Sequence, residues 1–208
     1  MTAPASSSAR FLIVGPQGSG KGTQGVLVAS AFEVPSISTG DVFRANISGG
    51  TELGGRVQAI VEAGDLVPDE LTCELVRDRL GQPDAARGFL LDGFPRNRAQ
   101  VDDLEDFLAS RGEALDAVIE LVVPREESIA RLRQRVIDQG RTDDTEEVIA
   151  NRLAIYERET APILDAYRGR GLVVRIDGVG SLAEVTARIF EALASRELVP
   201  AHPVHGAA

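Results

Sequence analysis

Residues 11–23 read FLIVGPQGSGKGT and join a short apolar run to a glycine-rich loop and a lysine. Turn-forming residues bound the run at residues 11–14 at once, which is typical of a buried strand. Residues 23–32 have the apolar spacing of a helix. The stretch therefore predicts a strand, a glycine-rich loop and a helix in succession.

The loop at residues 15–21 has the spacing G-x-x-x-x-G-K of a phosphate-binding loop. Glycines let such a backbone curl with its N–H groups inward, and the following helix adds the positive end of its dipole. Lys21, the only lysine among 22 basic residues, would bring a mobile ammonium to the β and γ phosphates. The alternative is a flexible glycine turn that happens to carry a lysine, and the flanking strand and helix disfavour it.

One position departs from the generic loop. Gly22 stands where Ser or Thr usually follows the lysine as a magnesium ligand, and Thr23 comes one place later. This argues against a generic ATPase or GTPase, and it does not establish a direct magnesium ligand in the loop. A GTPase is disfavoured further because its Asn-Lys-x-Asp motif needs a second lysine, which the chain lacks.

The rest of the chain alternates between short apolar runs and helical patterns, which indicates an α/β fold with a parallel sheet covered on both faces. Further strands are expected at residues 34–38, 89–91, 117–123 and 172–176. Further helices are expected at residues 41–47, 53–63, from 68 onward, 99–110, 126–139, 145–166 and 181–195.

Composition narrows the class of protein. A length of 208 residues favours one domain, and 43% hydrophobic with 26% charged residues excludes bulk disorder. A net charge of −10 disfavours a broad nucleic-acid-binding surface. The single cysteine, Cys73, cannot form an internal disulfide or a multi-thiolate zinc site, so a reducing cytoplasm is the simplest compartment.

The two ends of the chain are expected to be tails. Residues 1–9 lack the apolar core of a secretory signal, and residues 199–208 carry both histidines, so a histidine-dependent mechanism is not expected. No apolar run reaches the roughly 20 residues that a membrane-spanning helix needs. We therefore expect no membrane attachment.

Arginines could supply the positive charge that phosphoryl transfer needs. Arg131 and Arg135 are four apart and so share a helix face. Arg141 is expected in a loop at a helix start, because Asp143 and Glu146 have the spacing of a capping box. A solvated, salt-bridged surface remains the alternative, since acidic residues are interspersed. The candidates are Arg44, Arg96, Arg131, Arg135, Arg141 and Arg152.

Asp92 follows an apolar run and so lies at the carboxyl end of an expected strand, where ligands bind in doubly wound sheets. Mg²⁺ keeps several waters and takes few carboxylates, so we expect Asp92 to contact magnesium through water. The alternative is an aspartate that only accepts N–H groups of the following turn. Asp177 has the same setting without a partner motif, and a structural role is expected for it.

Several segments, in this order, closely resemble adenylate kinase. The resemblance covers about residues 10–195. It rests on residues 15–24, 38–41 with Arg44, 65–67, and 92–96 with Gln100, and then on Arg131, Arg135, residues 141–144, Arg152 and residues 160–162.

The resemblance implies a three-layer P-loop kinase fold with a five-stranded parallel core at residues 10–198. It also implies two mobile inserts, an NMP-binding one at about residues 38–67 and a lid at about 134–144. The implied reaction is reversible transfer of the γ-phosphoryl group of Mg·ATP to AMP, giving two ADP and balancing the adenine nucleotides. The lid is expected to be short and free of zinc, because few residues separate Arg135 from Arg141 and no cysteine pair exists.

The resemblance also implies roles for individual residues. Gln100 can offer the paired donor and acceptor that an adenine edge needs, and at Asp65 only the backbone is expected to matter. Arg141 and Arg152 would grip phosphates near the transferred group, with Arg131 assisting, and Lys21, Arg96 and Arg135 complete the catalytic set. The implied ATP site is Gly18, Ser19, Gly20, Lys21, Gly22, Thr23, Arg135 and the backbone of Gly180. The implied AMP site is Thr39, Arg44, Asp65, Leu66, Val67, Gly93, Phe94, Pro95, Arg96, Gln100, Arg141 and Arg152.

Two other functions compete with this interpretation. Two positions disfavour a UMP/CMP kinase on the same scaffold. That subfamily typically has Ser-Ala-Gly where this chain has Ser38-Thr39-Gly40, and it favours asparagine near the position of Gln100. A nucleotide-sensing module without catalysis is disfavoured because all the expected arginines are present. We therefore expect a cytoplasmic monomer that binds ATP, AMP and ADP.

Overall fold

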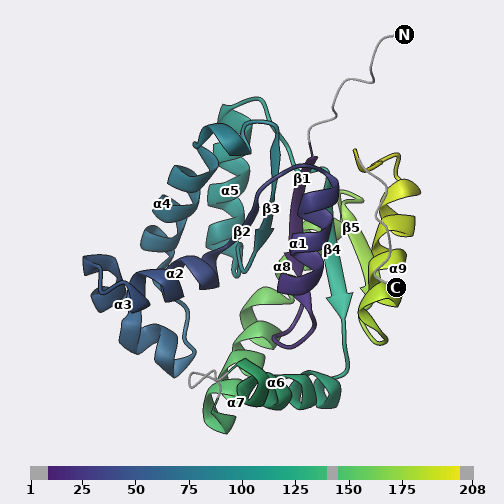
Figure 1. Ribbon diagram of the computed structural model, residues 1–208. Coiled ribbons are helices and arrows are strands. Elements are labelled where there is room, and N and C mark those ends of the chain that lie inside the picture. The colour runs from purple at the N-terminus through teal and green to yellow at the C-terminus, as the bar shows by residue number, and fades with distance from the viewer. Residues whose placement is uncertain (1–8, 140–144, 202–208) are drawn as a thin grey trace.

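The computed structural model describes residues 9–139 and 145–201. In these ranges five strands form one sheet in the order β2-β3-β1-β4-β5, and every neighbouring pair is parallel (Figure 1). This confirms the predicted α/β fold. The strands are β1 (Ala9–Val14), β2 (Ser36–Ser38), β3 (Gly88–Asp92), β4 (Ala117–Val122) and β5 (Val173–Asp177).

The strand register brings three functional segments to one edge of the sheet. Ile13 of β1 and Ser38 of β2 both lie opposite Asp92 of β3. The strands are parallel, so the turns that follow them all leave from the same edge. The glycine-rich loop therefore begins beside the carboxyl ends of β2 and β3.

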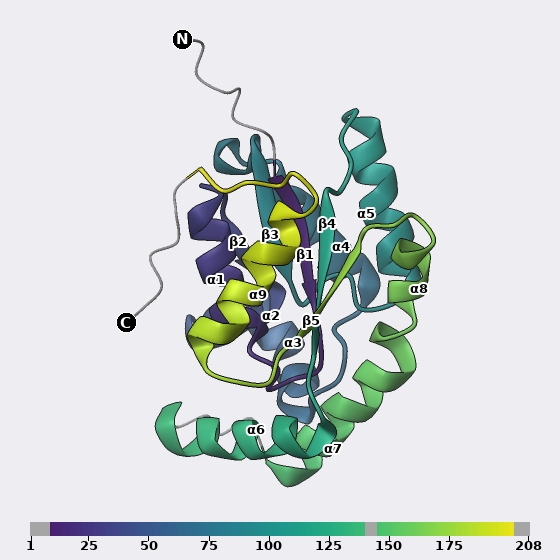
Figure 2. The ribbon, with the colours of Figure 1, turned by 90° about the vertical axis from the view of Figure 1, so that its right-hand side faces the viewer.

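Alternating residues of β1 separate the core into two halves. Phe11 and Ile13 pack with α1 (Lys21–Ala31) and α9 (Leu182–Ala194), whereas Leu12 and Val14 pack on the opposite face. Figure 2 shows the two helical layers on either side of the sheet. The second layer consists of α4 (Asp69–Leu80), α5 (Arg98–Ser110) and α8 (Ile163–Arg168).

A small helical unit lies beyond the edge strand β2. It consists of α2 (Thr39–Ser48) and α3 (Glu52–Ala63), and it has its own apolar cluster around Phe43, Val57 and Val67 (Figure 1). The two helices approach closely at Gly54, where an added Cβ would lie 2.2 Å from the Asn46 carbonyl oxygen. This unit lies within the range expected for the NMP-binding insert.

The expected single helix over residues 145–166 is wrong. The structure has α7 (Glu146–Ile155), a π-helical segment η2 (Tyr156–Thr160) and then α8. The Ala161 amide donates to the Tyr156 carbonyl at 2.8 Å, an i to i+5 bond, and Pro162 follows without an N–H to continue the ladder. The helix therefore changes its winding where it passes the edge of the sheet.

The expected capping box of Asp143 and Glu146 is also wrong. Thr145 is the N-cap of α7, and its side chain accepts from the Val148 amide at 3.3 Å. Glu146 is therefore the first helical residue, and Asp143 lies outside the described residues. Helix α6 (Arg125–Gln139) precedes this junction, and Figure 2 shows α6 and α7 below the sheet.

The chain segments at both ends of the described region have partners. Ala9, expected in a tail, is buried and pairs with Gly88 in the sheet. The Ala201 amide donates to the Ala31 carbonyl at 3.0 Å.

A short 3₁₀ turn, η1 (Pro83–Ala85), joins α4 to β3. None of the helices described here combines the length and apolarity needed to cross a bilayer.

Candidate active site

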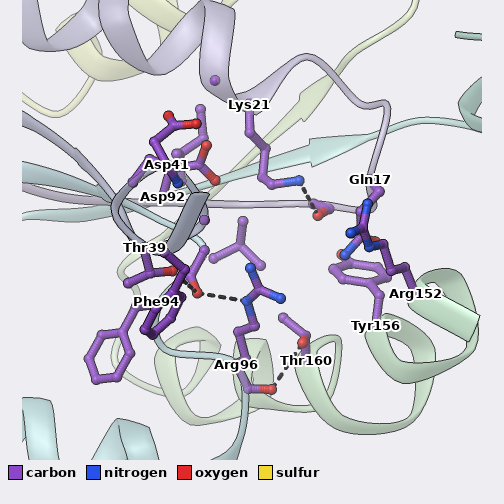
Figure 3. Close-up of a pocket in the computed structure, with 18 of the residues that line it drawn as sticks. Gln17, Lys21, Thr39, Asp41, Asp92, Phe94, Arg96, Arg152, Tyr156 and Thr160 are labelled. Carbon is purple, nitrogen blue, oxygen red and sulfur yellow. Dashed lines mark hydrogen bonds between the residues drawn. The ribbon is translucent and has the colours of Figure 1, made fainter. Parts of the chain in front are cut away.

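A cavity of about 520 Å³ opens at the carboxyl edge of the sheet. In Figure 3 the side chains of Lys21, Arg96 and Arg152 converge on it from different elements. The structure thereby brings most of the predicted site residues into one place. Those that line it are Gly18, Gly20, Lys21, Gly22, Thr23, Thr39, Arg44, Asp65, Leu66, Val67, Asp92, Gly93, Phe94, Pro95, Arg96, Gln100, Arg131, Arg135 and Arg152.

Three predicted residues are not among the lining residues. Ser19 is buried within the glycine-rich loop, with 2% of its surface exposed. Gly180 lies in the turn after β5, beside Glu184. Arg141 lies outside the described residues.

The glycine-rich loop adopts backbone angles that favour glycine. Gly18 and Gly20 have φ of 81° and 94°, in the left-handed region. A Cβ on Gly18 would lie 2.5 Å from the Ser128 carbonyl oxygen, so the loop also packs closely against α6. Gly20 is the N-cap of α1, which places the helix N-terminus at the cavity.

The Lys21 ammonium folds back over its own loop. Its Nζ donates to the carbonyl oxygens of Gly15 at 2.7 Å and Pro16 at 2.9 Å (Figure 3). Burial is the main cause that lowers the pKa of Lys21 to about 8; Asp92 opposes this shift, whereas Arg96 and Arg135 add to it. A bound polyanion would stabilise the charged form of this ammonium.

Asp92 lies at the end of β3 beside the start of α1. A Cβ on Gly22 would lie 3.7 Å from Asp92 Oδ2, so the carboxylate faces this part of the helix. Burial raises the pKa of Asp92, although Lys21 and Arg96 counteract the shift. The carboxylate is therefore a desolvated oxygen donor next to the phosphate-binding loop.

Arg96 is fixed by its own turn. Its Nε donates to the Gly93 carbonyl at 2.7 Å. Burial lowers the pKa of Arg96, as do the nearby cations Arg152 and Arg44, whereas Asp92 raises it. Arg44 pairs with Asp41 on α2. Three guanidinium groups, those of Arg44, Arg96 and Arg152, therefore lie near one another in the cavity lining.

Two further arginines approach from α6 and α7. Arg131 donates to Glu127 at 2.7 Å and to the Gly178 carbonyl at 3.1 Å, which links α6 to the turn after β5. Arg152 donates to the Val61 carbonyl of α3 at 3.2 Å. Both arginines line the cavity, and Arg131 is at the same time part of an ion pair with Glu127.

Positive charge is concentrated in this cavity, although the chain as a whole is acidic. Lys21 and five arginines line it, whereas the whole chain has a net charge of −10. The acidic lining residues are Asp41, Asp65 and Asp92. Such an arrangement suits a ligand with several negative charges.

Gln100 is held by polar groups on both sides of its amide. Only 2% of its surface is exposed, its Oε1 accepts from the Arg96 amide at 2.8 Å, and its Nε2 donates to Asp69 at 2.7 Å. Nearby, the Thr39 hydroxyl donates to the Gly93 carbonyl at 2.9 Å. Hydrogen bonds therefore link four of the residues predicted for the AMP site: Thr39, Gly93, Arg96 and Gln100.

Sequence reasoning missed several residues of the site. Tyr156 lines the cavity because the π-helical segment lies there. The apolar periodicity of the sequence gave no signal for a π-helix. Asn151 donates to the Ala63 carbonyl at 3.0 Å and to Asp65 Oδ1 at 2.8 Å. The Asp65 side chain therefore has a partner on α7, in addition to the backbone role expected for this residue. Gln17, Asp41 and Phe43 also line the cavity.

The comparisons with known proteins agree on one family. The family model described as adenylate kinase matches residues 13–172. The chain is 57% identical over 190 residues to the adenylate kinase of Leifsonia xyli subsp. xyli, a match that covers 91% of this chain and 96% of that protein. It is 54% identical over 187 residues to the adenylate kinase of Thermobifida fusca, covering 90% and 99%. Identity to the adenylate kinase of Clavibacter michiganensis subsp. michiganensis is 54% over 191 residues, covering 92% and 96%.

Proposed function

The chain belongs to the adenylate kinase family, and from this premise we propose how the cavity carries out the reaction. The protein is a phosphotransferase that moves the γ-phosphoryl group of ATP reversibly to AMP, giving two ADP. The gathering of Lys21 and five arginines around one cavity is the observation that carries the proposed mechanism. Neither a pyrimidine acceptor nor a purely sensing role is favoured.

The cavity has two halves that suit the two substrates. The glycine-rich loop and the N-terminus of α1 offer inward amides and Lys21 to the ATP phosphates. The turn after β3, with Thr39 and Arg44 of α2, offers guanidinium groups and the Gln100 amide to AMP. The resemblance also assigns the backbone of Gly180 to the ATP adenine and Arg141 to the phosphates.

Transfer needs alignment and positive charge more than covalent help from the protein. A phosphate oxygen of AMP attacks the γ phosphorus in line, and the bond to the β–γ bridging oxygen breaks as ADP leaves. Lys21, Arg96 and Arg152 neutralise the charge spread over the transferring group, and Arg131 and Arg135 support them from α6. Closure of the two inserts, at about residues 38–67 and 134–144, would exclude water and prevent ATP hydrolysis.

Asp92 fits a role toward the magnesium ion that accompanies ATP. Its carboxylate is a hard oxygen donor of the kind Mg²⁺ prefers, and it lies beside Gly22 at the start of the ATP side. The ion would neutralise phosphate charge and orient the β and γ groups. Contact through water agrees with the glycine at position 22, which offers no hydroxyl ligand. The lid is proposed to be free of zinc, because Cys73 is the only cysteine of the chain.

A cytoplasmic monomer is the proposed state of the protein. A lone buried cysteine suits a reducing compartment. Among the described residues, the large apolar side chains that are exposed are Val26, Val179, Leu182 and Val199. These offer little continuous apolar surface for a stable self-association.

The pKa of Lys21 can be measured directly, because the only lysine gives a single Cε resonance in an NMR titration. We expect a midpoint of about 8 in the free protein, since burial disfavours the ammonium. Adding ATP without AMP should raise the midpoint, because phosphates stabilise the charged form. ATP binding should therefore take up protons near pH 8 and weaken as the pH rises further. A free-protein midpoint near 10.5, the ordinary value, would contradict this picture.

The base-reading role of Gln100 predicts a change in selectivity. For Gln100→Ala we expect kcat/KM for AMP to fall by about tenfold to a hundredfold, because a paired donor and acceptor are lost. The preference for AMP over UMP should shrink, while the KM for ATP stays the same. ADP formation with each of the two acceptors measures the effect. Gln58→Ala, on the exposed side of α3, is the matched control, and unchanged selectivity in the Gln100 variant would refute the role.

A further inference from the structure

A carboxylate behind the AMP side of the cavity joins two helix starts. Asp69 is the first residue of α4, and its Oδ1 accepts from Asn97 Nδ2 at 2.9 Å and from Gln100 Nε2 at 2.7 Å. Asn97 is in turn the N-cap of α5 and accepts from the Gln100 backbone amide at 3.0 Å. Gln100 lines the cavity and Asp69 does not, so the carboxylate contacts Gln100 from behind.

The two partners of the Gln100 side chain are chemically opposite. A carboxylate only accepts hydrogen bonds, whereas the backbone N–H of Arg96 only donates. The amide nitrogen must therefore face Asp69, and the amide oxygen must face Arg96. A reversed amide would place oxygen against oxygen and N–H against N–H at a site with 2% exposure, where water cannot replace the lost bonds.

This arrangement leaves some hydrogen-bonding groups of the Gln100 amide available to a ligand. A primary amide has two N–H donors and two oxygen lone pairs, and Asp69 and Arg96 use one of each. One donor and one acceptor remain, in an order set by the protein. Adenine matches that order with its N1 acceptor and 6-amino donor, whereas hypoxanthine and guanine present an N1–H donor and a 6-oxo acceptor.

We propose that Asp69 is a positioning residue that fixes the direction of the Gln100 amide and makes the acceptor site select 6-aminopurine over 6-oxopurine monophosphates. The inference rests on the proposed contact between Gln100 and the acceptor base. Cytosine presents the same order of acceptor and amino donor as adenine. Asp69 therefore discriminates adenine from hypoxanthine, and the rejection of CMP has a different cause.

The test compares AMP and IMP as acceptors with Mg·ATP as donor. For Asp69→Ala we expect the ratio of kcat/KM for AMP to that for IMP to fall by about tenfold, because only the Arg96 amide then opposes a turned Gln100 side chain. The KM for AMP should rise, while kcat at saturating AMP and the KM for ATP should not change. Asp69→Asn should keep most of the selectivity, because both amide donors meet the single atom Oδ1, which asparagine retains.

Asp103→Ala is the matched control. Asp103 of α5 also bonds to α4, through Arg77 at 3.1 Å, and this ion pair does not involve Gln100. We expect its AMP-to-IMP ratio to equal that of the unmodified protein. An equal fall in both alanine variants would mean that loosening of α4 against α5 causes the effect, and the proposal would be wrong.

Gln100→Ala separates this proposal from the one on which it rests. If Gln100→Ala lowers the ratio and Asp69→Ala does not, Asp69 has no positioning role although Gln100 contacts the base. If neither variant changes the ratio, the base contact of Gln100 itself is wrong. Should Asp69→Ala fail to fold in a thermal melt, Asp69→Ser replaces it, since a hydroxyl both donates and accepts and so imposes no direction on the amide.

Discussion

Lys21→Ala is expected to abolish turnover and to leave the protein folded. The ammonium is the mobile charge of the phosphate-binding loop, so we expect kcat to fall on the order of 10³-fold or more, as for other groups that stabilise transition-state charge. The fold should not depend on it. Its hydrogen bonds run to the carbonyls of its own loop, and its lowered pKa shows that burial disfavours the charge in the free protein.

Three measurements check this expectation: ADP formation, ATP affinity and a thermal melt. Arg98→Ala is a suitable control, because it removes one cation from an exposed pair with Asp102 on α5. The control should keep full activity. A Lys21→Ala protein that turns over within tenfold of the unmodified rate would exclude the lysine from the mechanism.

Arg152→Ala is expected to lower kcat by about 10³-fold, the lower range known for transition-state arginines. In the ligand-free structure its guanidinium contributes to the lowered pKa of Arg96, so two cations lie close together where a polyanion is expected. Its bond to the Val61 carbonyl holds it at the cavity wall, within reach of α3. The same expectation applies to Arg141, which lies outside the described residues.

Steady-state kinetics with both substrates separates the loss of kcat from changes in KM for Arg152→Ala. Arg158→Ala removes an exposed arginine from the π-helical segment that follows α7, where it pairs with Glu159, and serves as the control. A near-normal kcat in Arg152→Ala would remove this arginine from the catalytic set. A fall of the same size in the control would point instead to disturbance of the helix.

Local patterns predicted the part of the site that depends on neighbours in sequence. The glycine spacing after β1 predicted a tight loop that leads into a helix, and the structure has positive φ at Gly18 and Gly20 and the start of α1 at Lys21. The alternation of apolar runs likewise predicted all five strands. The family resemblance then identified most of the residues that line the cavity.

Features that depend on distant partners could not be predicted in this way. Asn151 contacts the end of α3, about 90 residues earlier in the chain, and Asp69 contacts Gln100 across two helix starts. No periodicity encodes such pairs. The capping-box spacing favoured Asp143, which has Glu146 three residues later, whereas the actual N-cap Thr145 has Val148 there and uses only its backbone amide.

In the proposed mechanism, the turn after β3 contributes to both substrate sites within five consecutive residues. Asp92 faces the donor side, the Gly93 carbonyl accepts from both Thr39 and Arg96, and Arg96 faces the acceptor side. The separation between the two nucleotides would thus be set by a short length of main chain that begins at the end of β3. The outer helices can change in length during evolution without altering this distance. One residue inserted between Asp92 and Arg96, by contrast, would change the distance between the two bound substrates.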